Sequence, residues 1–147
     1  MKRVLFICTG NTCRSPMAEA ILKHKAEEVL EVQSAGIYAV PGNEASEQTK
    51  EVLKERGISC EHRSQALSPE LLQWATVVLT MTENHKQWII SHYPNMLEKV
   101  FTLKEYALGE NGLAGDVVDP FGGSVDEYRV TANEIEMMLD KLWSKKK

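Results

Sequence analysis

Four short apolar runs alternate along the chain with longer segments whose apolar positions recur at helical spacing. The runs are rich in β-branched and other apolar side chains, which is typical of buried strands, and they cover residues 2–8, 31–36, 76–81 and 99–103. Strands that alternate with helices form parallel sheets with helices on both faces. We therefore expect an α/β fold in one domain over residues 1–147: a three-layer α/β/α arrangement around a central four-stranded parallel sheet.

Capping residues and glycines predict where the helices begin and end. Ser15 is expected to cap the first helix, with Pro16 at its first position and Glu19 in its first turn. Similar signals predict the other helices, over 46–56 with Ser46 as cap and Gly57 as stop, from Ser68-Pro69, from Thr82 to Pro94, and over about 126–144. A polar loop rich in glycine is expected over residues 105–125.

Composition and charge exclude several classes of protein. The 147 residues carry a net charge of −4, which argues against broad nucleic-acid binding. No apolar run approaches the ~20 residues that cross a bilayer. Three cysteines are too few, and odd in number, for the disulfide framework of a small secreted protein. We expect a cytoplasmic monomer that binds neither nucleic acid nor membrane.

The segment CTGNTCRS, residues 8–15, joins the first predicted strand to the first helix and resembles an anion-binding loop. In parallel α/β folds, ligands bind at the carboxyl ends of the strands, where this segment lies. Backbone N–H groups of Thr9 to Ser15 would surround a phosphate group, and Gly10 and Asn11 permit unusual backbone angles. Arg14 has the planar fork that matches two phosphate oxygens. We expect a phosphate-binding loop without the Walker A pattern.

Cys8 is the candidate nucleophile at the mouth of this loop. The helix dipole, the N–H groups and Arg14 favour its thiolate, so we expect a lowered thiol pKa. A thiolate beside a bound phosphoryl group can attack the phosphorus, and the same donors would stabilise the transition state. A lone cysteine at a strand end is usually a small buried hydrophobe. The catalytic interpretation is favoured here because the same segment also contains glycine, asparagine, arginine and serine.

A phosphoryl transfer of this kind also needs a general acid. The best candidate is Asp119 in VVDPFGG, because Pro120 restrains it to an extended conformation and the glycines let the loop fold over a ligand. Its rivals in the same region are Asp116, Asp126 and Glu105.

Three motifs resemble those of the low-molecular-weight protein phosphatases. CTGNTCRS resembles that family's C-x5-R-[S/T] loop, DPF at 119–121 its acid loop, and SAG at 34–36 its second strand. The resemblance implies that Cys8 forms a cysteinyl-phosphate, that Arg14 binds the phosphoryl oxygens, and that Asp119 acts first as acid and then as base.

The resemblance also assigns supporting roles around the loop. It implies that Asn11, Ser15 and Ser34 brace the loop by hydrogen bonds. Cys13 is similar to a second loop cysteine that forms a disulfide with the nucleophile, which suggests a reversible oxidative switch. The family implies neither metal nor organic cofactor.

Thr12 bears on the choice of substrate. A threonine at this position resembles the bacterial protein-arginine phosphatase branch of the family. Tyrosine-directed relatives usually have a bulkier aliphatic residue there. A short side chain leaves room for the guanidinium of phosphoarginine, and Val40 and Phe121 are expected to wall the pocket, although Phe121 also suits a core position. We expect arginine-phosphorylated proteins as partners, with tyrosine-phosphorylated proteins as the alternative.

Other functions fit the sequence less well. Arsenate reductases use a similar loop but need two further cysteines downstream, and this chain has only Cys60. A phosphate-binding module without catalysis would not need both nucleophile and acid. Residues 60–62, Cys-Glu-His, lack further metal ligands nearby, and His85, His92, Trp74 and Trp88 are expected to be packing or surface residues.

Overall fold

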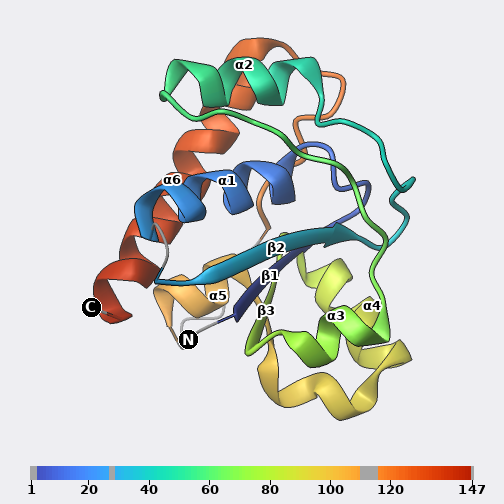
Figure 1. Cartoon of the computed structure of the whole chain (residues 1–147). Coiled ribbons are helices and arrows are strands. Elements are labelled where there is room, and N and C mark those ends of the chain that lie inside the picture. Colours follow the sequence, from blue (N-terminus) through green and yellow to red (C-terminus); the bar gives the residue numbers. More distant parts are fainter. Residues whose placement is uncertain (1–2, 27–28, 110–115, 147) are drawn as a thin grey trace.

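The four predicted strands form one parallel sheet. The computed structural model describes residues 3–26, 29–109 and 116–146. The strands are β1 (Arg3–Cys8), β2 (Glu31–Gly36), β3 (Val77–Thr80) and β4 (Val100–Thr102), in the spatial order β2-β1-β3-β4. All three pairings are parallel, so the carboxyl ends of the strands meet at one edge (Figure 1). The predicted fold class is confirmed.

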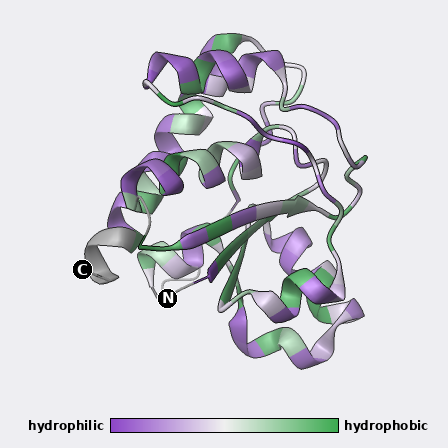
Figure 2. Ribbon diagram, in the orientation of Figure 1, coloured by the Kyte–Doolittle hydropathy of each residue, from purple (hydrophilic) through white to green (hydrophobic). Residues whose placement is uncertain are grey.

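Helices cover both faces of the sheet because β1 buries its side chains alternately on each face. Val4 and Phe6 pack with one group of helices: α1 (Arg14–Ala26), α2 (Glu47–Glu55), α5 (Leu103–Leu108) and α6 (Val125–Lys146). Leu5 and Ile7 pack with the other group: α3 (Pro69–Trp74), α4 (Glu83–His92) and the 3₁₀ helix η1 (Pro94–Lys99). In Figure 2 the central strands are largely hydrophobic and the helices are two-sided, as this layering requires.

Two of the three predicted caps are confirmed. The side chains of Ser46 and Ser68 accept hydrogen bonds from the first turns of α2 and α3, and Thr82, where a helix was expected to begin, caps α4 in the same way. Ser15, in contrast, lies inside α1, whose first turn contains no acidic residue, so the expected cap and the placement of Glu19 are wrong. The Ser15 hydroxyl instead faces Cys8.

The expected loop over residues 105–125 is also shorter than predicted. Its beginning belongs to α5, which the Thr102 side chain caps, and Val125 already starts α6. Residues 110–115 lie outside the described part, and residues 116–124 form the loop that reaches the carboxyl edge of the sheet. No helix in the described ranges combines the length and apolar character that crossing a membrane requires.

Candidate active site

The carboxyl end of β1 opens into a cavity of about 250 Å³. Its lining combines Asp119 and Phe121 of the 116–124 loop with every residue from Cys8 to Arg14 except Asn11. The tight turn between β1 and α1 and the 116–124 loop therefore bring the candidate nucleophile, arginine and acid to one space. A larger, open hollow of about 580 Å³ lies between α1 and residues 57–62, and none of the residues from Cys8 to Arg14 lines it.

Arg14 and Asp119 face each other across the cavity. The Arg14 side chain is buried, its Nη1 donates to the Val117 carbonyl at 3.1 Å, and its Nη2 lies 3.5 Å from Asp119 Oδ2. The Asp119 side chain is 51% exposed, and its Oδ1 accepts from the Phe121 N–H at 3.0 Å. This exposure leaves the carboxyl group accessible for proton exchange with a substrate and with water.

The three rival carboxylates are engaged elsewhere. Asp116 accepts from the backbone N–H of Glu83, Asp126 pairs with Arg129, and Glu105 pairs with Lys86. None of the three is among the residues that line the cavity. Asp119 is thus the carboxylate best placed for acid chemistry at Cys8.

Cys8 is a buried thiol surrounded by hydrogen-bond donors. Its Sγ lies 2.8 Å from Ser15 Oγ and accepts from the Asn11 N–H at 3.3 Å. Burial raises the pKa of the Cys8 thiol, and the contacts with Ser15 and Asn11 and the charge of Arg14 lower it without cancelling that effect. The sequence-based expectation of a lowered pKa is therefore wrong, because it considered the donors and not the burial.

Asn11 organises the loop from its centre. It is fully buried with a positive φ of 58°, which asparagine tolerates better than most residues. Its Nδ2 donates to Ser15 Oγ and Ser34 Oγ, both at 2.9 Å, which are the contacts expected for the bracing residues. Gly10, which permits unusual angles, is not among the described residues with positive φ.

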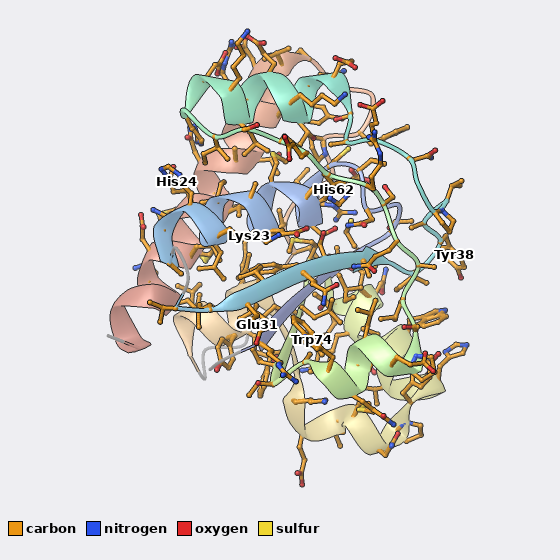
Figure 3. The ribbon with its side chains drawn as sticks, in the orientation of Figure 1. Lys23, His24, Glu31, Tyr38, His62 and Trp74 are labelled. Carbon is orange, nitrogen blue, oxygen red and sulfur yellow. The ribbon has the colours of Figure 1, made fainter. Side chains whose placement is uncertain are left out.

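Residues of the 62–65 segment also hold the loop in place through hydrogen bonds to Asn11. These contacts were not predicted from the sequence. His62 Nε2 donates to the Asn11 carbonyl at 2.7 Å, and Ser64 Oγ donates to it at 2.8 Å. His62 lies beside α1 (Figure 3), with its Nδ1 3.6 Å from a Glu19 carboxylate oxygen. Burial raises the pKa of Glu19, but contacts with His62, Lys23 and Ser34 outweigh it, so this pKa lies below its usual value.

Cys13 lies in the same loop but has different neighbours. Its Sγ is 3.2 Å from the hydroxyl of the buried Tyr128 on α6, and burial together with Cys13 raises the pKa of Tyr128 to about 12. Both Cys8 and Cys13 are free thiols that line the cavity.

The side chains expected to shape the pocket are placed unequally. Thr12 and Phe121 line the cavity, and Phe121 is 74% exposed, so it forms a wall and not part of the core. Val40 is 60% exposed and is not among the lining residues, so the structure does not bring it to this wall.

The tryptophans and histidines of α3 and α4 are expected from the sequence to be packing or surface residues. Trp74 and Trp88 pack against the cluster under α3 and α4, as predicted. Exposed His92 stacks on Trp88, whereas His85 is buried and reaches Thr9 in the loop, a contact that no local pattern indicates. Within the described ranges, Cys60 and its neighbours form no group of three or more potential metal ligands.

Comparison with known proteins agrees with the class that the fold and the cavity define. Residues 3–147 match the family model described as low molecular weight phosphotyrosine protein phosphatase, and the chain belongs to this family. It is 49% identical to a protein-arginine-phosphatase of Geobacillus stearothermophilus, over 97% of this chain and 95% of that protein.

Two solved structures are similar over nearly the whole chain. The YwlE arginine phosphatase from Geobacillus stearothermophilus superposes with a TM-score of 0.93 at 48% identity, covering 99% of this chain and 92% of that one. A YwlE arginine phosphatase in which serine replaces a cysteine, with the active-site serine phosphorylated, has a TM-score of 0.92 at 46% identity, covering 97% and 94% of the two chains.

Proposed function

We propose that this protein is a cysteine-dependent phosphatase that hydrolyses phosphoarginine in proteins. The observation that carries the proposal is the single cavity in which Cys8, Arg14 and Asp119 meet, with Thr12 on its wall. A binding module would not need a nucleophile and an acid facing the same ligand space. Relatives at close to half identity over nearly the full length carry the name protein-arginine-phosphatase or arginine phosphatase.

In the first step the Cys8 thiolate attacks the phosphorus and forms a P–S bond. The P–N bond to the substrate guanidinium breaks, and Asp119 gives its proton to the leaving nitrogen. Arg14 and the N–H groups of the loop bind the equatorial oxygens of the transition state.

In the second step Asp119 takes a proton from water. The water oxygen attacks the phosphorus of the cysteinyl-phosphate, the P–S bond breaks, and inorganic phosphate leaves. Cys8 is released as the thiolate, and Asp119 is again protonated. No metal or organic cofactor enters this sequence, because the loop itself supplies the positive charge that the phosphoryl oxygens need.

Thr12 supports phosphoarginine as the substrate. Its short side chain at the cavity wall leaves room for a planar guanidinium, which is wider at the phosphorus-bearing end than an aryl oxygen. A larger aliphatic side chain at this position would suit an aromatic ring better. The proposed partners are therefore arginine-phosphorylated proteins, in the cytoplasm.

The experiment compares kcat/KM for phosphoarginine and phosphotyrosine in the same peptide sequence, at neutral pH under reducing conditions. We expect a preference for phosphoarginine and a shift toward phosphotyrosine in Thr12→Ile. Cys8→Ser provides the blank, since it removes the proposed nucleophile. A wild-type preference for phosphotyrosine would leave the mechanism standing and overturn the assignment of the substrate.

Phosphotyrosine is the second candidate substrate, and Phe121 favours it. The exposed ring lines the cavity, where it can pack against the phenyl group of a phosphotyrosine. Arsenate reduction is not supported, because the three cysteines include no pair downstream of the loop.

The shared cavity also supports a reversible oxidative switch. Peroxide would convert the Cys8 thiolate to a sulfenic acid, and Cys13 would displace water from it to form a disulfide. Activity that survives peroxide, with no loss that a thiol reductant restores, would count against this switch.

A further inference from the structure

His85 connects α4 to the wall of the catalytic cavity. It is buried at 8% exposure, and its Nε2 lies 2.9 Å from the hydroxyl oxygen of Thr9, which lines the cavity. Its other ring nitrogen, Nδ1, is buried and has no hydrogen-bond partner among the described residues. Among the described residues, the ring therefore has one hydrogen-bond partner, Thr9, which belongs to the loop that lines the cavity.

The unpaired Nδ1 indicates how the ring is protonated. An unpaired buried N–H group is rarer in native structures than an unpaired acceptor, so the proton belongs on Nε2. Nε2–H then donates to Thr9 Oγ1, and Nδ1 carries only a lone pair. Burial and the charge of Arg14 lower the pKa of His85 to about 4, which keeps the ring neutral at ordinary pH, although Asp116 and Asp119 act in the opposite direction.

This contact fixes the hydroxyl oxygen of Thr9, a residue that lines the cavity. A hydroxyl oxygen has two lone pairs, and His85 occupies one of them, so one remains available as an acceptor. The guanidinium of phosphoarginine presents N–H donors beside the phosphorus, whereas the ring of phosphotyrosine presents none. A fixed acceptor at this wall would therefore pair with the first substrate and stay unpaired with the second.

We propose that His85 is a positioning residue for phosphoarginine, which holds the Thr9 hydroxyl oxygen where it accepts an N–H of the substrate guanidinium. The neutral ring performs this role without adding a positive charge that would repel the guanidinium. The inference rests on the proposed function and adds to it a second contact that selects the substrate, on the β1–α1 turn and independent of Thr12.

The test measures kcat and KM for matched phosphoarginine and phosphotyrosine peptides in the full-length protein. His85→Phe keeps an aromatic ring and removes both nitrogens, and His85→Gln restores one N–H donor near the position of Nε2. Thr9→Val removes the hydroxyl at constant shape. His92→Gln is the matched control, because His92 is an exposed histidine on the same helix.

We expect the preference for phosphoarginine over phosphotyrosine to fall by about tenfold in His85→Phe and in Thr9→Val, the size of one hydrogen bond to a charged group. The double variant should lose no more than either single variant, because both remove the same contact. His85→Gln should recover part of the preference, and His92→Gln should keep all of it.

Other outcomes separate this inference from the proposed function. If the wild-type protein does not hydrolyse phosphoarginine, the proposed function itself fails. If it does, and the activity toward both peptides falls equally in His85→Phe and in Thr9→Val, the inference is overturned. The His85–Thr9 contact would then affect phosphate binding or the fold. Additive losses in the double variant would likewise overturn it.

Discussion

The hydroxyl of Ser15 contacts the Cys8 sulfur and has no role in capping its helix. It lies 2.8 Å from Cys8 Sγ and also accepts from Asn11 Nδ2, so its own proton is directed toward the sulfur. A hydroxyl donor stabilises a thiolate more than a thiol. Ser15 is therefore one of the groups that oppose the effect of burial on the Cys8 pKa.

Replacing Ser15 by alanine should raise the pKa of the Cys8 thiol further. The thiolate fraction at neutral pH then falls, so alkylation of Cys8 by iodoacetamide becomes slower and its pH profile moves to higher pH. The measurement is best made in a Cys60→Ser background, with the alkylated residue identified by mass spectrometry. Ser68→Ala makes the same chemical change at the cap of α3 and should leave the profile in place. A Ser15→Ala profile that overlays that of the parent protein would contradict this assignment.

At the scale of elements, the loop is held in shape by its neighbours, and one of them is Gly36 at the end of β2. A Cβ at this position would lie 2.6 Å from the Thr9 carbonyl oxygen and 2.9 Å from the Asn11 nitrogen. The absence of a side chain thus lets the Cys8–Ser15 loop pack on the end of β2. The backbone of Thr9 also accepts the Tyr38 N–H at 2.9 Å, which ties the following residues to the same loop.

Gly36→Ala is expected to destabilise the protein by about 1–3 kcal/mol, as overpacking of a close contact does, and to reduce activity by displacing the loop. Chemical denaturation with a matched activity assay measures both effects. Gly10→Ala is the control for stability, because its added Cβ would meet its nearest neighbour, Thr12 Oγ1, only at 3.8 Å. Equal stability of the two variants would show that the loop yields to the added methyl group without cost.

The strands, the caps at Ser46 and Ser68 and the Cys8–Ser15 loop could be predicted because their signals lie within a few residues of one another. The contacts of His62 and His85 could not, since they join the loop to residues 51 and 76 positions away. The prediction of a lowered Cys8 pKa was wrong for a related reason. The burial of the thiol depends on all the elements packed around it, whereas the hydrogen-bond donors can be identified in the loop sequence itself.

At the scale of the whole molecule, both layers of helices contact the residues that line the cavity. From one face of the sheet, α1 supplies Arg14 to the lining and Tyr128 of α6 contacts Cys13, whereas from the other face His85 of α4 contacts Thr9. A buried neutral histidine at this junction links the stability of the fold to pH. The linkage depends on the difference between the pKa of His85 in the folded protein and its value in the unfolded chain.

The pKa of His85 is about 4 in the folded protein, against 6.5 for an exposed histidine. Between these values the unfolded chain binds a proton that the folded protein excludes, so stability rises with pH across this window and falls as the pH drops through it. Acidification should therefore cost up to about 3 kcal/mol through this group, whereas above pH ~7 its contribution is constant. Glu19, whose pKa is lowered, adds its own loss only below the usual range of glutamate.

Urea unfolding at several pH values between about 7 and about 4.5 measures this linkage directly. In His85→Gln the decline of unfolding free energy with falling pH should be shallower than in the wild-type protein, whatever the variant's stability at neutral pH. His92→Gln removes an exposed histidine and should keep the wild-type slope. Parallel curves for the wild-type protein and His85→Gln would mean that His85 accepts its proton in the folded protein as readily as in the unfolded chain. The assignment of a buried, neutral His85 ring at the Thr9 contact would then be wrong.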